Sequence, residues 1–94
     1  METQNVRAHV IIAGRVQGVA FRADTRWAAQ RIGVFGWVRN RRDGSVEAVI
    51  EGETQRVEDM LAWCRKGSAL ARVDDVRLEW EPYTGEFTTF VITF

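Results

Sequence analysis

The chain has 94 residues, which suits a single domain over residues 1–94, and 46% of them are hydrophobic, including four Trp and five Phe. This apolar content can fill one compact core and argues against intrinsic disorder. A lone Cys excludes an internal disulfide, and no apolar run is long enough for a signal peptide or a membrane span. We therefore expect a cytoplasmic protein that does not engage a membrane.

The basic and acidic residues cancel in number but are unevenly distributed. Residues 14–42 contain seven Arg and one Asp, a net charge of +6, whereas residues 43–94 contain five basic and eleven acidic residues, a net charge of −6. The first region therefore favours an anionic ligand, and the overall balance argues against a protein that coats nucleic acid. Arginines on solvated faces would give the same count, so both interpretations stay open.

The first half of the chain predicts a strand, a helix and a hairpin. A β-branched run over residues 6–13 indicates a strand, and apolar spacing from Phe21 predicts a helix that ends at Gly33. Strands follow over residues 34–41 and 45–51. A tight turn at 42–44 joins them, because Asp-Gly supplies the positive φ angles that such turns need.

The second half predicts a helix and two strands. The helix covers residues 53–66, and its apolar stripe consists of Val57, Met60, Leu61 and Cys64. A strand follows over residues 73–80, with Val76, Leu78 and Trp80 facing inward, and a last strand covers residues 87–94. The order β-α-β-β-α-β plus a terminal strand predicts a ferredoxin-like α+β fold, an antiparallel sheet with both helices on one face. This topology carries enzymes, RNA-binding modules and metal carriers alike.

The connection between the first strand and the first helix, Gly14–Arg22, is the candidate ligand-binding loop. Its glycines allow a tight turn, and successive backbone N–H groups beside a helix N-terminus form a cradle for an anion. Arg22 lies in the first helical turn, where its planar guanidinium can bond two phosphate oxygens at once. An ordinary βα turn with solvated arginines fits the same short pattern.

Two long motifs together make the pattern specific. Residues 14–22 read G-R-V-Q-G-V-A-F-R, and residues 36–46 read G-W-V-R-N-R-R-D-G-S-V, with a glycine following at position 52. In both motifs, and over essentially its whole length, the chain resembles the acylphosphatases. The resemblance implies hydrolysis of a small-molecule acyl phosphate to a carboxylate and inorganic phosphate. It also implies a reaction with no cofactor, no metal and no covalent phosphoenzyme.

The resemblance assigns roles to particular residues. Arg22 would hold the phosphate and stabilise its charge, and Asn40 would position the attacking water. The backbone N–H groups of the loop would assist Arg22; they belong to Arg15, Val16, Gln17, Gly18 and Val19. Because a carboxylate is a good leaving group, no general acid is needed, and the sequence offers no evident catalytic base. Two positions depart from the commonest family pattern, Ala20 and the Gly67-Ser68 pair, and neither removes a catalytic group.

Other reactive residues receive structural interpretations. His9 has no partner acid or cysteine at ligand spacing along the chain, so we expect neither a catalytic dyad nor a metal site there. Cys64 is expected to be buried, and the adjacent Asp74 and Asp75 point to opposite faces of a strand. The four Trp residues are assigned to core or sheet packing. Three arginines of the predicted hairpin either draw in the substrate or are solvated: Arg39, Arg41 and Arg42.

Two alternative functions remain. An RNA-binding module shares this topology, although the open face of the third strand would present Glu47, Val49 and Glu51, and acids repel a phosphate backbone. A non-catalytic, acylphosphatase-like regulatory domain, such as the one that begins hydrogenase-maturation carbamoyltransferases, is the second alternative. The length of the chain favours a free-standing enzyme, and a monomer is the default expectation.

Overall fold

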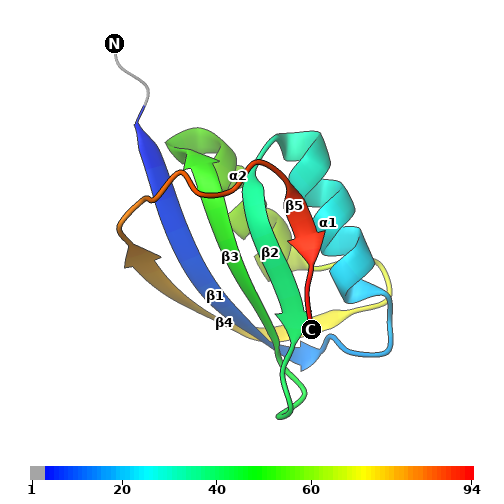
Figure 1. Cartoon of the computed structure of the whole chain (residues 1–94). Helices are drawn as coiled ribbons and strands as arrows, with labels where there is room; N and C mark the ends of the chain where they lie inside the picture. The colour runs from blue at the N-terminus through cyan, green and yellow to red at the C-terminus, as the bar shows by residue number, and fades with distance from the viewer. Residues whose placement is uncertain (1–3) are drawn as a thin grey trace.

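The computed structural model describes residues 4–94 as one sheet of five strands covered by two helices. The elements in chain order are β1 (Asn5–Arg15), α1 (Phe21–Ile32), β2 (Phe35–Asn40), β3 (Val46–Glu53), α2 (Thr54–Lys66), β4 (Arg72–Glu81) and β5 (Phe90–Ile92). The strands are ordered β4-β1-β3-β2-β5. Both helices lie on the same face of the sheet, and the other face is open (Figure 1). The predicted ferredoxin-like fold is confirmed.

The terminal strand differs from its neighbours in direction and length. The pairs β1–β3, β1–β4 and β2–β3 are antiparallel, as predicted, but β5 pairs parallel to β2, so the complete sheet is mixed. Only Phe90–Ile92 form strand, in place of the predicted residues 87–94. The preceding residues must carry the chain from the β4 edge of the sheet to the β2 edge, and this crossing leaves few residues for pairing (Figure 1).

The core lies between the sheet and the helices. The apolar stripe predicted for α2 is buried in full, and α1 buries Phe21, Thr25, Ala28 and Ala29. The rings of Phe21 and Trp63 pack together with their centroids 5.6 Å apart. On the sheet side the core is formed mainly by alternate residues of β1 and β3: Ala8, Val10, Ile12, Val46, Ala48 and Ile50.

Two tryptophans contradict the packing prediction. Trp27 lies on the outer side of α1 and is 63% exposed, with the Arg31 guanidinium 4.8 Å from its ring centroid. Trp80 is 53% exposed, although its register opposite the buried Ala8 places it on the inward face of β4, as predicted. Since β4 is an edge strand, no strand lies beyond it to cover the large ring. Trp37 and Trp63 are half-buried, in agreement with the prediction.

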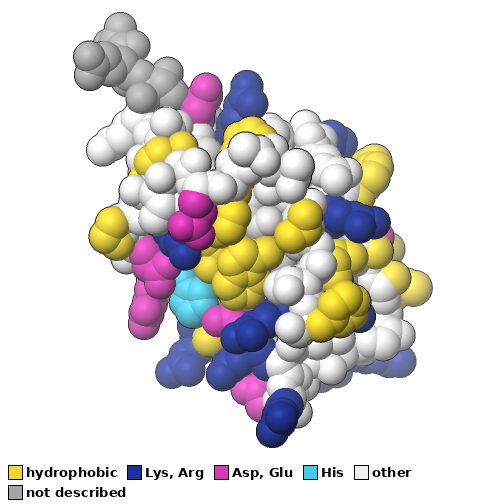
Figure 2. All heavy atoms as spheres, viewed as in Figure 1, with side chains coloured by type: hydrophobic (Ala, Val, Ile, Leu, Met, Phe, Trp, Pro, Cys, Tyr) yellow, Lys and Arg dark blue, Asp and Glu magenta, His cyan; other side chains and the backbone are white. Residues whose placement is uncertain are grey.

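The open face of the sheet corrects two further expectations. His9 does have an acidic partner, because its Nε2 lies 2.6 Å from Oε2 of Glu47 on the neighbouring strand β3. In Figure 2 this histidine is surrounded by acidic, basic and apolar side chains of the open face. Val49 and Glu51 are not presented to solvent on that face as expected, since each is only 2% exposed. Glu51 is covered by the segment that follows β4. Its carboxylate accepts hydrogen bonds from Arg7 and from the backbone N–H groups of Thr84 and Gly85.

Candidate functional site

The loop between β1 and α1 owes its shape to glycines and to one strained alanine. The β1–β4 register shifts between Ala13 and Gly14, and a Cβ on Gly14 would lie 2.1 Å from the Arg72 carbonyl oxygen, so only glycine fits there. Gly18 has φ +74° and open space beside it. Ala20 adopts φ 60° and is the one non-glycine residue with positive φ among residues 4–94. This left-handed conformation turns the chain sharply into α1.

The loop encloses a hollow of about 190 Å³, which also receives a residue from β2. Arg22 and Asn40, far apart in the sequence, both line it. The complete lining is Val16, Gln17, Gly18, Ala20, Phe21, Arg22, Ala23, Asn40 and Ile92. Three of the five residues predicted to form the anion cradle therefore line the hollow: Val16, Gln17 and Gly18. Arg15 belongs to β1, opposite Arg72, and Val19 packs against the core, so neither lines the hollow.

Arg22 is a cation without an acidic partner in the part of the chain that the structure describes. Its guanidinium carbon lies 5.4 Å from the ring centroid of Phe94, which is 96% exposed. Ile92 and Phe94 adjoin the hollow because β5 pairs parallel to β2 beside α1. Sequence reasoning missed both residues, since no local pattern reveals which strand an edge strand will join.

Asn40 is the last residue of β2, where it pairs with Val46 of β3. Its side-chain oxygen Oδ1 is buried and has no hydrogen-bond partner among residues 4–94. A buried amide oxygen without a donor is unfavourable by roughly 1–3 kcal/mol, so a bound molecule that donates a hydrogen bond would be stabilised there. The hollow therefore combines a cation that has no acidic partner with an acceptor that has no donor among the described residues.

Gln17 connects the loop to the β2–β3 hairpin. Its Nε2 donates to the carbonyl oxygens of Arg41 (2.7 Å) and Ser45 (2.8 Å), the residues at the two ends of that hairpin. Within the hairpin, the Ser45 hydroxyl and N–H donate to Asp43, and these bonds hold the pKa of the Asp43 carboxyl below its usual value. The turn forms where it was predicted, but only Gly44 has the expected positive φ (+91°) and Asp43 does not. The side chain of Gln17 thus sets the distance between the loop and Asn40.

The three hairpin arginines are not equivalent. Arg39 donates to Glu47 (2.6 Å), and Arg41 lies 3.6 Å from a carboxylate oxygen of Asp43, whereas Arg42 is exposed and forms no ion pair among residues 4–94. All three line a second, larger hollow of about 610 Å³ that shares Asn40 with the first and also includes Phe94. Whether they capture substrate stays a prediction.

A further observation bears on the predicted chemistry. Cys64 is fully buried, and this burial raises the pKa of its thiol to about 12, so it is not a nucleophile.

Within residues 4–94, neither helix has the length and apolar character that crossing a bilayer requires.

Comparison with known proteins identifies the family. The acylphosphatase family model matches residues 8–92. The chain is 57% identical to an acylphosphatase of Syntrophobacter fumaroxidans, covering 94% of this chain and 91% of that protein. It is 52% identical to an acylphosphatase of Pelotomaculum thermopropionicum, covering 94% and 96%. The crystal structure of an acylphosphatase from Bacillus subtilis superposes with a TM-score of 0.90 at 30% identity, over 95% of this chain and 99% of that one. With the fold, both motifs and these relatives in agreement, the chain belongs to the acylphosphatase family.

Proposed function

We propose that the chain hydrolyses small-molecule acyl phosphates in the hollow between the β1–α1 loop and β2. One observation carries the proposal: the Arg22 guanidinium, without an acidic partner among residues 4–94, and the Asn40 amide oxygen, without a donor among them, line the same small hollow. A water oxygen attacks phosphorus, the bond between phosphorus and the carboxylate oxygen breaks, and the products are a carboxylate and inorganic phosphate.

Arg22 binds the phosphate in this mechanism. Its fork of N–H donors bonds two phosphate oxygens, and the backbone N–H groups of Val16, Gln17 and Gly18 bond the third. Arg15 and Val19 do not line the hollow but flank these three residues, and we extend the same role to their backbone N–H groups. Because Arg22 has no acidic partner within the described residues, its charge is available to the oxygens as they gain negative charge in the transition state.

Asn40 positions the attacking water. The buried Oδ1 atom accepts a hydrogen bond from the water, which directs an oxygen lone pair toward phosphorus. The proton that the water loses passes to a phosphate oxygen of the substrate. The carboxylate leaves without protonation, because it is already a stable anion at neutral pH. The mechanism therefore uses no side chain as general acid or base.

We further propose that the enzyme acts as a cytoplasmic monomer and binds no nucleic acid. A reducing compartment fits a chain whose lone Cys is buried and unpaired. Acidic side chains on the open sheet face, among them Glu47 and Glu79, disfavour an RNA backbone. Strong retention on immobilised RNA, with no phosphate release, would favour the RNA-binding alternative instead.

Phosphate release from benzoyl phosphate in the presence of EDTA tests the proposal, with p-nitrophenyl phosphate as the non-acyl comparison. Arg22→Ala and Asn40→Ala should each lower kcat/KM for benzoyl phosphate by at least about 10²-fold. The matched controls are Arg26→Ala, an exposed arginine of α1, and Asn5→Ala, an exposed asparagine of β1, which should both retain activity.

Two outcomes would contradict these assignments. Folded Arg22→Ala or Asn40→Ala protein with near-wild-type turnover would remove that residue from the mechanism. A folded wild-type chain that releases no phosphate would favour a regulatory domain. Circular dichroism on each variant separates loss of chemistry from loss of fold.

A further inference from the structure

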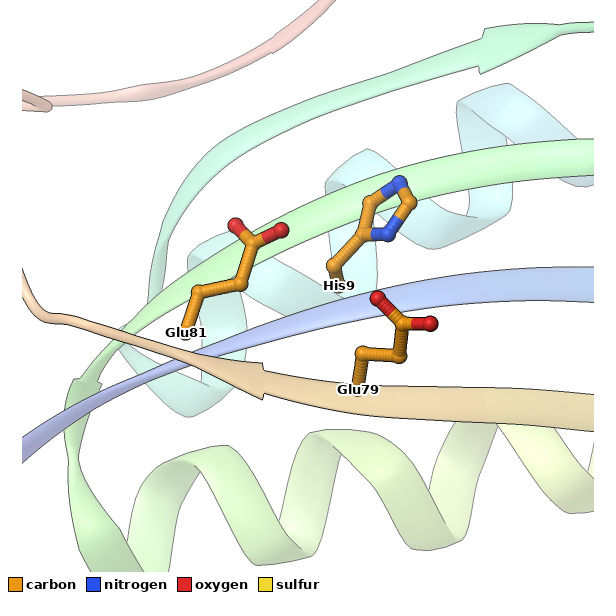
Figure 3. A group of neighbouring side chains, drawn as sticks. All are labelled: His9, Glu79 and Glu81. Atoms are coloured by element: carbon orange, nitrogen blue, oxygen red, sulfur yellow. The ribbon is translucent and has the colours of Figure 1, made fainter.

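Three potential metal ligands meet on the open face of the sheet, away from the catalytic hollow. His9 of β1 pairs directly with Glu79 of β4, and Glu81 follows two residues later on the same face. One nitrogen of His9 and one carboxylate oxygen from each glutamate all lie within 4.8 Å of one another. Figure 3 shows both carboxylates directed toward the imidazole ring. No pattern in the sequence indicates this group, because strand register alone assembles it.

The hydrogen bond of His9 decides which of its nitrogens is free. Nε2 lies 2.6 Å from Oε2 of Glu47, and an ionised carboxylate only accepts, so Nε2 carries the hydrogen and donates it. Neutral His9 then has its lone pair on Nδ1, and in Figure 3 that side of the ring faces Glu79. Arg39 in turn donates to Oε1 of Glu47 (2.6 Å). A carboxylate that accepts the second ring N–H is one of the usual outer-shell partners of a metal-bound histidine.

Both glutamates keep an oxygen available. Glu81 accepts from Arg7 Nε through Oε1 (2.9 Å), which leaves Oε2 free and holds the side chain near His9. Glu79 forms no hydrogen bond or ion pair with another side chain among residues 4–94, and it is exposed. A hollow of about 350 Å³ beside His9 and Glu79 gives a path from solvent.

We propose that Nδ1 of His9 and the carboxylates of Glu79 and Glu81 form a binding site for Zn²⁺, with water as the fourth ligand. One imidazole and two carboxylates suit Zn²⁺ better than Mg²⁺ or Ca²⁺, which favour all-oxygen sites. Tetrahedral bonds of about 2.0–2.2 Å bring ligand atoms to roughly 3.4 Å from one another. Small rotations of the Glu79 and Glu81 side chains would supply that closure from the 4.8 Å within which the ligand atoms lie. The metal would tie the edge strand β4 to β1 and takes no part in the hydrolysis.

Zn²⁺ binding can be followed at a single imidazole, since His9 is the only histidine of the chain. The only thiol, that of Cys64, is fully buried and does not compete for the metal. The experiment is a titration of untagged protein carrying ¹⁵N-labelled histidine with ZnCl₂, followed by imidazole ¹H–¹⁵N correlation spectra. We expect Nδ1 to shift on binding and to saturate near one equivalent. Glu79→Gln and Glu81→Gln should each weaken Zn²⁺ binding at least about tenfold, and Glu47→Gln by about 10–100-fold.

Glu58→Gln is the matched control, because Glu58 is an exposed glutamate of α2. It should bind Zn²⁺ as the wild type does, and Zn²⁺ should raise Tm in both. Hydrolysis of benzoyl phosphate should be unchanged in Glu79→Gln. A shift at Nε2 instead of Nδ1, no shift up to about 1 mM Zn²⁺, or equal affinity in Glu79→Gln and Glu58→Gln would each overturn the proposal.

Discussion

The hollow between the β1–α1 loop and β2 differs from the open face of the sheet in how many of its charged and polar groups have partners. In the hollow, Arg22 has no acidic partner and Asn40 Oδ1 no donor among the described residues. On the open face, Arg7 bonds both Glu51 and Glu81, and Glu47 is shared between His9 and Arg39. Groups that have found partners stabilise the fold, whereas groups left without them are available to a ligand.

Glu79 is an exception on the open face. Unlike Glu47 and Glu81, it has no hydrogen bond or ion pair with another side chain among residues 4–94, and it lies beside the lone pair of His9. Because a side chain without a partner is available to a ligand, as in Arg22 and Asn40, Glu79 is a candidate metal ligand and not a residue that stabilises the fold. The variants below test whether partnered groups do govern stability while the hollow governs activity.

The largest effect on stability is expected at Glu51. Glu51→Ala removes a buried carboxylate and leaves the N–H groups of Thr84 and Gly85 without their acceptor, while Arg7 keeps its bond to Glu81. The free energy of unfolding should fall by about 3–5 kcal/mol. Urea unfolding measures this loss. Activity of the folded fraction should be retained. Glu53→Ala is the control: its exposed pair with Arg56 should change stability by less than about 1 kcal/mol.

The contribution of Glu51 should also depend on pH. Burial alone would raise the pKa of this carboxyl, but hydrogen bonds from Thr84, Arg7 and Gly85 outweigh burial and lower it. A lowered folded-state pKa stabilises the protein above the unfolded pKa of about 4.3, and that stabilisation is lost as the pH falls through the folded-state value. The difference in unfolding free energy between wild type and Glu51→Gln should therefore be full at pH 7 and shrink below about pH 4. A difference independent of pH would contradict this account.

A smaller effect, on both stability and activity, is expected at Gln17. Gln17→Ala removes two hydrogen bonds that hold the loop to the hairpin, so unfolding free energy should fall by about 1–2 kcal/mol. Because a displaced Asn40 misplaces the water, kcat should also fall about tenfold. Gln30→Ala on the exposed side of α1 should change neither quantity. Equal kcat in Gln17→Ala and wild type would mean that Asn40 is positioned without this side chain.

The smallest effect, of opposite sign, is expected at Ala20. Glycine adopts the left-handed conformation freely, so Ala20→Gly should stabilise the protein by up to about 1 kcal/mol. Ala62→Gly, on an exposed helical position of α2, should instead destabilise it by about 0.5–1 kcal/mol. The shift of the urea midpoint in each variant gives the sign directly. Destabilisation in both would show that Ala20 is not strained.

Most elements were predictable because their signals are local. Apolar spacing located α1 and α2 to within a residue, and Asp43-Gly44 marked the hairpin turn. The candidate site was predictable because two long motifs carry Arg22 and Asn40, and the hollow brings these two residues together. Contacts that depend on strand order were not predictable. His9 meets Glu47 only because β3 lies beside β1, and Glu51 is covered only because the chain crosses back after β4.

By itself, the sequence determined the family and the order of the elements, and it predicted which loop residues would bind phosphate, because periodicity, turn chemistry and motif spacing are properties of neighbouring residues. Tertiary structure alone decided that Trp80 is exposed at an edge, that Phe94 reaches Arg22, and that His9 lies beside two glutamates. Each of these depends on which strands become neighbours and in what register. Strand order and register depend on the apolar surface that the whole chain buries, so no short segment of sequence reveals them.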